Sequence, residues 1–265
     1  MSLNHPITDW KGRTVWVLGA STGIGAALGR ALDEKGAHLI ASGRHLNTLE
    51  SAFPNPRVKK VVLDITDPQG VARALDGLTR DGCLPDCVIW VAGDYSPQPI
   101  TAPRGFDPVR ARQVLETNLV CIYDGLAAIL SHWLPLSPRA PAAPPFHICL
   151  FSSVAGYRGL PKALAYSASK AGLNALAETA HVELKPLGVD VSIVCPGFVK
   201  TRLTDGNDFE MPALITAEQA ARFTFKGLAR GEFEVHYPKR FSLFMKLLGL
   251  LPAAIYLRLI AKVRA

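Results

Sequence analysis

The chain has 265 residues, of which 49% are hydrophobic and 19% are charged, and its formal net charge is +7. This apolar content can bury a core large enough to offset the entropy of ordering the chain, so a mostly disordered protein is excluded. The histidines and cysteines form no H-E-x-x-H pattern and no paired C-x-x-C, so no metal site is predicted.

Residues 1–13 contain no apolar stretch of signal-peptide length, and the five cysteines lie mostly inside apolar runs. We therefore expect reduced thiols and a cytoplasmic location. Residues 226–265 contain eight Lys or Arg and two Glu, which leaves a charge of only +1 for residues 1–225. The basic character thus belongs to the C-terminal tail.

The first predicted elements are a strand at residues 14–18, a glycine turn, and a helix over residues 26–35. Further apolar runs of strand length are separated by segments long enough for helices. Such alternation predicts an α/β fold, a doubly wound, Rossmann-like parallel sheet covered on both faces, in a single domain. These later runs are residues 37–41, 58–63, 87–91, 147–151 and 189–194.

Two irregular segments interrupt this alternation. Residues 135–145 contain five prolines, which predicts an exposed connection before the fifth strand. Residues 201–212 follow the sixth strand and are rich in charged and turn residues. We expect this second segment, together with the tail, to line the substrate pocket, with the segment serving as a lid.

The turn after the first strand reads Gly-Ala-Ser-Thr-Gly-Ile-Gly over residues 19–25. Glycines allow close approach of the backbone to a pyrophosphate, and free N–H groups at a helix start favour negative charge. A purely steric role for the glycines is the alternative.

The end of the second strand indicates which dinucleotide would bind. A chain that binds NAD is expected to place an acidic residue there, but none occurs between Leu39 and His45. Arg44 stands at this point instead, and its guanidinium is suited to a 2′-phosphate. NADP(H) is therefore predicted in preference to NAD, the alternative being that Arg44 only faces solvent.

Three polar residues predict a catalytic set. Ser153 follows the fifth strand, and Tyr166 and Lys170 lie four residues apart, on one face of a predicted helix. A nearby ammonium offsets part of the cost of forming a phenolate. The neutral phenol already carries the proton that a carbonyl reduction requires.

At these residues the sequence resembles the short-chain dehydrogenase/reductase family, in its single-domain branch, and the resemblance covers nearly the whole chain. Each motif is short, but their joint order is specific. In chain order the motifs are Gly19, Gly23 and Gly25; Asp64-Ile65; Ala92-Gly93; Asn118; Ser153; Tyr166 with Lys170; and Pro196-Gly197 with Thr201.

The resemblance implies hydride transfer between NADP(H) and a carbonyl or alcohol. Tyr166 would donate or accept the proton and Ser153 would hold the substrate oxygen. Lys170 would bind the nicotinamide ribose and lower the pKa of the tyrosine, and Asn118 would hold a water in a proton relay.

The resemblance also implies the cofactor contacts. Asp64 and Ile65 would flank the adenine, Pro196 and Gly197 would line the nicotinamide, and Thr201 would meet the carboxamide or the phosphates. The complete predicted cofactor set is Gly19, Ser21, Thr22, Gly23, Ile24, Gly25, Arg44, Asp64, Ile65, Ala92, Gly93, Tyr166, Lys170, Pro196, Gly197 and Thr201.

Two positions depart from the family pattern. Val91 stands where the family usually has asparagine, and Leu18 replaces the usual threonine before Gly19. Both usual residues stabilise backbone turns, so the departures bear on local geometry. They also leave open a catalytically silent dinucleotide-binding regulator.

The tail predicts two amphipathic helices separated at Pro252, one on Phe241, Phe244, Met245 and Leu248 and one on Tyr256, Leu259, Ile260 and Val263. We place a Rossmann-like catalytic domain at residues 1–238 and a helical extension at residues 239–265. Within the tail the longest charge-free stretch is eleven residues, 247–257, too short to span a bilayer.

Three roles for the tail remain open. It could contact a membrane surface, which would make the chain a peripheral membrane protein. It could instead cover the active site and admit an apolar substrate, or pack on the body or on a partner subunit. Nucleic-acid binding is not expected, because the basic residues alternate with leucines. The helix after residue 163 is rich in small residues, and relatives associate through it, so a homodimer or homotetramer is expected.

Overall fold

The computed structural model describes residues 2–97, 100, 106–137, 143–205 and 210–263. Parts of the two irregular segments predicted at residues 135–145 and 201–212 therefore lie outside the described residues. Among the residues described, seven parallel strands form one sheet in the order β3-β2-β1-β4-β5-β6-β7. The strands are β1 (Thr14–Leu18), β2 (His38–Gly43), β3 (Lys59–Val62), β4 (Cys87–Trp90), β5 (Phe146–Phe151), β6 (Val189–Pro196) and β7 (Glu234–Tyr237).

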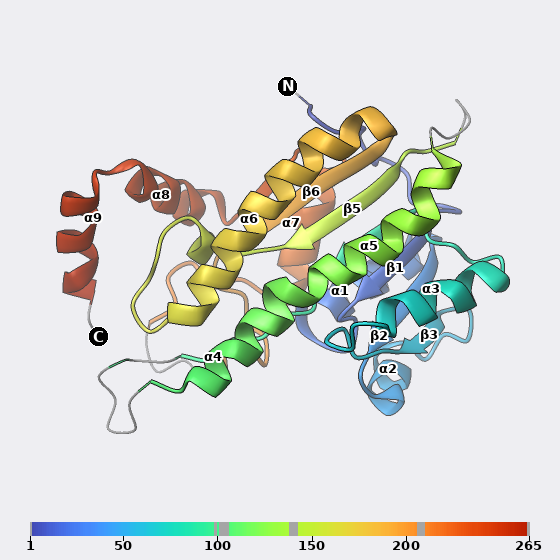
Figure 1. The fold of residues 1–265 in the computed structure, drawn as a ribbon, viewed down its shortest axis with the longest axis horizontal. Helices are drawn as coiled ribbons and strands as arrows, with labels where there is room; N and C mark the ends of the chain where they lie inside the picture. Colours follow the sequence, from blue (N-terminus) through green and yellow to red (C-terminus); the bar gives the residue numbers. More distant parts are fainter. Residues whose placement is uncertain (1, 98–99, 101–105, 138–142, 206–209, 264–265) are drawn as a thin grey trace.

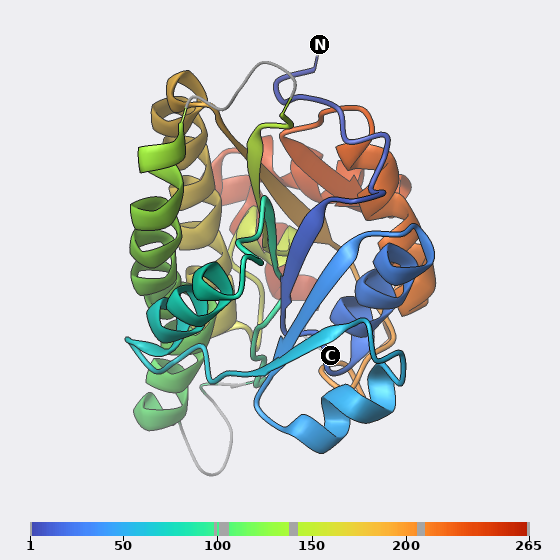
Figure 2. The same ribbon diagram turned by 90° about the vertical axis from the view of Figure 1, so that its right-hand side faces the viewer.

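Helices cover both faces of this sheet, as Figure 2 shows. One face carries α1 (Gly23–Glu34), α2 (Leu46–Ala52) and α7 (Ala217–Leu228). The other carries α3 (Gly70–Arg80), α4 (Pro108–Leu115), α5 (Cys121–Trp133) and α6 (Leu164–Leu184). The predicted doubly wound α/β fold is confirmed.

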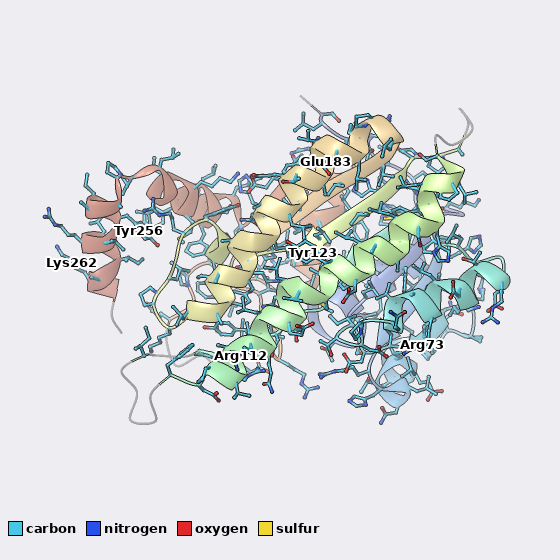
Figure 3. The ribbon with its side chains drawn as sticks, viewed as in Figure 1. Arg73, Arg112, Tyr123, Glu183, Tyr256 and Lys262 are labelled. Carbon is cyan, nitrogen blue, oxygen red and sulfur yellow. The ribbon has the colours of Figure 1, made fainter. Side chains whose placement is uncertain are left out.

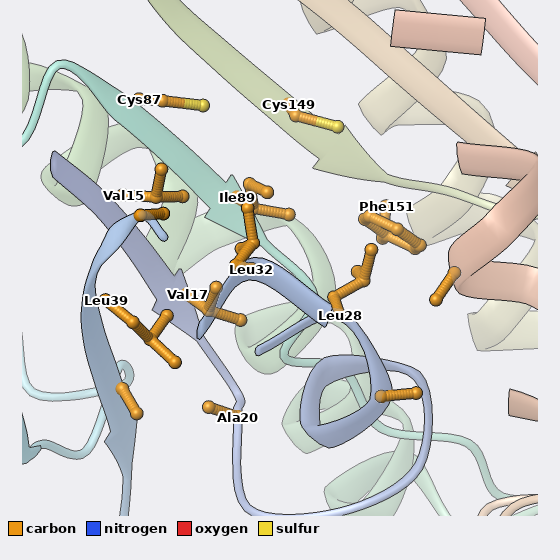
Figure 4. Packing of buried hydrophobic residues seen from close by; sticks show 14 of the residues in the cluster. Val15, Val17, Ala20, Leu28, Leu32, Leu39, Cys87, Ile89, Cys149 and Phe151 are labelled. Carbon is orange, nitrogen blue, oxygen red and sulfur yellow. The ribbon is translucent and has the colours of Figure 1, made fainter. Parts of the chain in front are cut away.

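Each face of the sheet has its own apolar core, because side chains alternate along a strand. Val15 and Val17 of β1 pack toward α1, where Leu28 and Leu32 are also fully buried (Figure 4). Trp16 belongs to the core on the opposite face. Central strands that are apolar on both sides explain the continuous apolar runs of the sequence.

One helical stretch of the described chain, residues 108–136, is long and apolar enough to cross a membrane by length and composition alone. Its apolar side packs against the sheet core, with Val114, Ile122, Ile129 and Trp133 buried. The stretch runs beside α6 on one face of the sheet (Figure 1). Packing within the fold therefore accounts for the apolar residues on the inner side of the stretch, while 33% of its most apolar window is buried.

Two features near the C-terminus refine the sequence predictions. The last strand, β7, was missed, because its four residues, Glu-Val-His-Tyr, form a short run with alternating polar residues. The tail forms two helices, α8 (Lys239–Leu250) and α9 (Ala253–Ile260), which end and begin on either side of Pro252. Met245 and Tyr256 are buried as expected, whereas Phe244 is 55% exposed and faces outward.

His147 is a buried titratable residue at the amino end of β5, 1% exposed. Its Nε2 lies 3.1 Å from Ser192 Oγ, and its Nδ1 has no partner within the described part of the chain. Burial lowers the pKa of His147 from 6.5 to about 4. Asp190 opposes this shift, while Arg13, Lys185 and His5 add to it.

We expect acid to destabilise the fold through this residue. Between pH 6.5 and pH 4 the unfolded chain binds a proton that the folded chain does not, so stability falls as pH falls. For His147 alone the loss between pH 7 and pH 5 is about 2 kcal/mol.

Urea unfolding of wild type and His147→Gln at these two pH values measures this loss. The variant should lose less stability than wild type, whereas the matched change at the exposed His38 should leave the loss unchanged. Equal losses in wild type and His147→Gln would contradict the assignment.

Candidate active site

The candidate site lies where the strand order reverses, between β1 and β4. In doubly wound sheets, ligands bind at this point beyond the carboxyl ends of the strands. The glycine turn leaves β1 here, and Ala92 and Gly93 leave β4 beside it. The backbone N–H groups of Gly19 and Ala20 donate to the carbonyl of Ser42 at 3.0 and 2.8 Å, which ties the turn to β2 as well.

Two glycines of this turn have no room for a side chain. Gly19 has φ +91°, and a Cβ there would lie 2.6 Å from the backbone nitrogen of Ala92. A Cβ on Gly25 would lie 2.0 Å from the carbonyl oxygen of Gly19. The turn is therefore packed tightly, and α1 starts against it, with no side-chain cap from Thr22 on its first N–H groups. This arrangement suits a pyrophosphate at the helix start.

A cleft of about 1030 Å³ opens above these strand ends. Ser153 lines it, together with every residue of the predicted cofactor set. That set lies at or after the carboxyl ends of β1, β2, β3, β4 and β6, with two residues on α6. It is Gly19, Ser21, Thr22, Gly23, Ile24, Gly25, Arg44, Asp64, Ile65, Ala92, Gly93, Tyr166, Lys170, Pro196, Gly197 and Thr201.

Ser153, Tyr166 and Lys170 meet at this cleft from two elements. Ser153 caps the short 3-10 turn after β5, accepting a hydrogen bond from the N–H of Ala155 at 3.1 Å. Tyr166 and Lys170 lie one turn apart near the start of α6, and the Lys170 Nζ atom is 5.8 Å from the centre of the Tyr166 ring. The predicted set is thus assembled in one place.

The protonation of these groups follows from their burial. Burial raises the pKa of Tyr166 to about 12, while a side-chain hydrogen bond with Ser153 acts in the opposite direction. Burial lowers the pKa of Lys170 to about 8, and its Nζ donates to the carbonyl of Phe151 at 2.8 Å. At pH 7 the phenol is therefore neutral and the lysine is charged, which is the state needed to donate a proton.

Asn118 lies beneath the cleft and does not line it. It is fully buried in a π-helical turn, Glu116–Val120, which joins α4 to α5. Its amide donates to the carbonyl of Asp94 at 2.8 Å and to Ser169 Oγ at 3.1 Å, and its Oδ1 accepts from the N–H of Asp94 at 2.7 Å. Its side chain therefore joins the loop after β4 to α6. The predicted role in holding a water remains a prediction.

Arg44 lies at the carboxyl end of β2, where the sequence predicts a 2′-phosphate contact. Its side chain is exposed at the cleft, and within the described residues it makes no hydrogen bond or ion pair. It is thus available to an anionic ligand. Among the described residues no cluster of three or more His, Cys, Asp or Glu side chains could hold a metal ion.

Leu18 and Val91, the two residues that depart from the family pattern, lie at or just after the ends of β1 and β4, and these ends remain hydrogen-bonded to each other. The carbonyl of Leu18 accepts hydrogen bonds from the N–H groups of both Val91 and Ala92 at 2.9 Å. Backbone groups therefore hold the β1–β4 junction, and the side chain of Leu18 is buried in the core. The replacements at Leu18 and Val91 therefore give no structural support to the alternative of a catalytically silent dinucleotide-binding regulator.

Several cleft residues were missed by the sequence analysis. Arg110 of α4 and Asp94 both line the cleft and pair at 2.7 Å. Tyr95, which is not among the lining residues, packs edge-on against the Tyr166 ring, with the ring centres 4.9 Å apart. Arg112 also lines the cleft, as does Arg202, which belongs to the segment 201–212 that was expected to line the pocket. The position of Asp94, directly after Ala92-Gly93, was the one available signal. No described tail residue is among those that line this cleft, so the contribution of the tail to the substrate pocket stays a prediction.

Comparison with known proteins identifies the family. The family model described as short chain dehydrogenase matches residues 13–210. A protein of Myxococcus xanthus (strain DK1622), described as an uncharacterized oxidoreductase, is 33% identical over 249 residues, or 92% of this chain and 94% of that protein. The chain belongs to the short-chain dehydrogenase/reductase family of oxidoreductases, as its motifs indicated.

Two further relatives are a dehydrogenase whose substrate is named and a crystal structure that contains NADP. A cis-4-hydroxycyclohexanecarboxylate dehydrogenase of Sinomonas cyclohexanicum is 32% identical over 225 residues, covering 83% of this chain and 85% of that enzyme. A crystal structure of a short chain dehydrogenase from Burkholderia cenocepacia J2315 in complex with NADP superimposes with a TM-score of 0.81. It is 28% identical and covers 96% of this chain and 99% of its own.

The packing of the glycine turn predicts the effect of a single methyl group. Gly25→Ala should destabilise the protein by about 1–3 kcal/mol, because the new Cβ overlaps the Gly19 carbonyl and the turn must open. Gly77→Ala is the matched control, since nothing lies within 4 Å of its Cβ position in α3, and it should stabilise by up to about 1 kcal/mol. Urea unfolding at pH 7 measures both changes, and a Gly25→Ala protein as stable as wild type would contradict this geometry.

Proposed function

We propose that the protein is an NADP(H)-dependent oxidoreductase that transfers a hydride between the nicotinamide and a small carbonyl or alcohol substrate. The observation that carries this proposal is the meeting of Ser153, Tyr166 and Lys170 at the cleft that begins at the glycine turn. The NADP bound to the relative from Burkholderia cenocepacia supports the choice of cofactor, as does Arg44, which lines the cleft, is exposed and forms no hydrogen bond or ion pair with the other described residues. The fit is good, because Gly19, Ser21, Thr22 and Gly23 line the cleft at the start of α1, where the Thr22 side chain caps none of the first N–H groups.

When bound, the reduced nicotinamide would supply the hydride. Tyr166 gives its phenolic proton to the substrate oxygen in the reducing direction and accepts it in the oxidising direction. Ser153 holds the same oxygen by a hydrogen bond. Because the hydroxyl and the phenol are fixed by β5 and α6, they are positioned before the substrate arrives.

Lys170 keeps the phenol close to a positive charge. Its ammonium donates one N–H to the carbonyl of Phe151, so its other N–H groups remain for the ribose hydroxyls of a cofactor. A nearby cation favours the phenolate and so eases proton loss from Tyr166, whose pKa burial otherwise raises. The described tail residues do not border the cleft, so the tail lends no support to an apolar substrate.

We also propose a homo-oligomer in a reducing, cytoplasmic compartment. Val120 and Tyr123 on the outer side of the helical stretch 108–136 and Val182 on the neighbouring α6 are 45%, 58% and 71% exposed, which supports association through these helices. Figure 3 shows Tyr123 on the outer side of α5. All the cysteines are free thiols, which supports the compartment: Cys83, Cys87, Cys121, Cys149 and Cys195.

Removing the Tyr166 hydroxyl tests the reaction. Tyr166→Phe should lower carbonyl reductase turnover by about 10²–10⁴-fold, because the general acid is lost, while NADPH binding is retained. Tyr123→Phe, which removes a hydroxyl from the exposed side of α5, is the matched control and should keep wild-type turnover. Steady-state rates of wild type and both variants are measured on a substrate that wild type reduces, and their NADPH affinity is measured by fluorescence. Unchanged turnover of Tyr166→Phe would overturn the assignment.

Arg44 tests the cofactor. Arg44→Ala should raise the dissociation constant of NADPH by about 10–100-fold through the lost charge-assisted hydrogen bonds, and should change that of NADH only a few-fold. The control, Arg57→Ala, removes another exposed arginine, from the loop before β3, and should change neither constant. Titration calorimetry with both nucleotides measures this preference. An equal change for the two nucleotides would contradict a 2′-phosphate contact.

A further inference from the structure

The described tail, residues 239–263, forms an arm that consists mainly of α8 and α9. Figure 1 shows the arm at one end of the molecule, beyond the loop that leads into α6. One side of the arm faces the body and the other faces outward. The two sides differ in chemistry, and this difference identifies the kind of surface that the arm fits.

The inner side of the arm is already fastened to the body. Arg158, in the loop after Ser153, donates to the carbonyls of Gly249 and Leu251 at 2.8 and 3.1 Å. Its guanidinium lies 4.4 Å from the centre of the Tyr256 ring, and the Tyr256 hydroxyl donates to the carbonyl of Gly159 at 2.6 Å. These contacts join the end of α8 and the middle of α9 to one loop.

A second attachment lies near the middle of α8. Lys246 pairs with Glu234 of β7, and the Tyr157 hydroxyl donates to the same carboxylate at 2.5 Å. Ser242 Oγ lies 2.7 Å from Nδ1 of His236, and the side chain of Met245 is buried, 6% exposed. The inner side of the arm therefore contacts the body through several side chains, and these contacts fix the orientation of the arm.

The outer side of the arm is apolar and exposed. It presents large hydrophobic side chains that make little contact with the body, the most exposed being Leu250 at 82%. Scattered single apolar residues are normal on a protein surface, but a set gathered on two consecutive helices marks an interaction site. The set is Leu243, Phe244, Leu247 and Leu250 on α8, with Ile255 and Leu259 on one face of α9.

The charges of the arm indicate the partner. Residues 239–265 contain six Lys or Arg and no Asp or Glu. Apart from Lys246, the four basic residues that the structure describes here form no ion pair with described residues and are exposed: Lys239, Arg240, Arg258 and Lys262. Lys262 points away from the body in Figure 3. Two such arms facing each other would place positive charge against positive charge, so charge complementarity favours an anionic partner over the arm of a second copy.

We propose that the arm docks on the surface of an anionic lipid bilayer. Its leucines and Phe244 would enter the boundary between headgroups and acyl chains, and the basic residues would contact the acidic headgroups. The helices have twelve and eight residues, too few to span a bilayer, so the arm would lie on the surface. The docking is independent of the reaction proposed for the cleft.

Co-sedimentation of the full-length protein with vesicles tests this docking. Wild type should pellet with vesicles of phosphatidylcholine and phosphatidylglycerol and much less with pure phosphatidylcholine. Raising the salt from about 0.1 M to about 1 M, which shortens the Debye length from roughly 10 Å to 3 Å, should weaken the binding. The double variant Leu247→Glu/Leu250→Glu should lower the partition coefficient by about 10-fold or more, because two leucines no longer enter the bilayer.

The matched control is Leu46→Glu, the same change at an exposed leucine of α2, which should pellet as wild type does. Thermal unfolding checks that both variants fold as wild type does, since the replaced side chains are exposed. Equal pelleting of wild type and the double variant overturns the proposal, and so does equal binding to neutral vesicles. Light scattering provides a further refutation: a wild type that fails to pellet and dissociates on the double substitution would show that copies of the chain associate through this face.

Discussion

The buried ammonium of Lys170 is the constraint around which the active-site end of the sheet is arranged. A charge removed from water is tolerated only where hydrogen bonds replace its hydration, and the carbonyl of Phe151, the last residue of β5, supplies one at 2.8 Å. Ser152 Oγ adds a second link, donating to the carbonyl of Lys170 at 3.1 Å. Because these bonds fix α6 against β5, they also fix Tyr166 relative to Ser153. The chemistry of the cleft therefore depends on where one lysine is buried.

The π-helical turn around Asn118 supports the same arrangement from the opposite side. An irregular turn in a long helix disturbs its regular hydrogen bonds, and such turns are frequent at functional sites. Here the turn brings the Asn118 amide to Asp94 and Ser169, so the loop after β4 and the helix of Tyr166 share one buried side chain. Asp94 in turn pairs with Arg110 of α4. The loop after β4 and the start of α6 are thereby held at a fixed separation.

The parts of the site that could be predicted are those set by local rules. The strand, glycine turn and helix follow from short-range sequence, and the four-residue spacing of Tyr166 and Lys170 fixes their common face on any helix. The pair of Asp94 and Arg110 could not be predicted, because its members are sixteen residues apart and belong to no motif. Phe244 shows a second limit: apolar residues occur on both sides of α8, so periodicity cannot say which side faces the body. Tertiary contacts decide that question.

The arm and the catalytic loop are linked through the residues that follow Ser153. Arg158 and Gly159 hold the arm, and the chain then continues into α6 and Tyr166 within a few residues. The body up to residue 225 carries a net charge of +1, whereas residues 226–265 carry +6. An electric field from a negative surface would therefore act mainly on this end of the molecule and orient it. The hydrogen bonds of Arg158 to Gly249 and Leu251 and of Tyr256 to Gly159 run to backbone carbonyls, so they depend on the Arg158 and Tyr256 side chains and not on the side chains of those three partners.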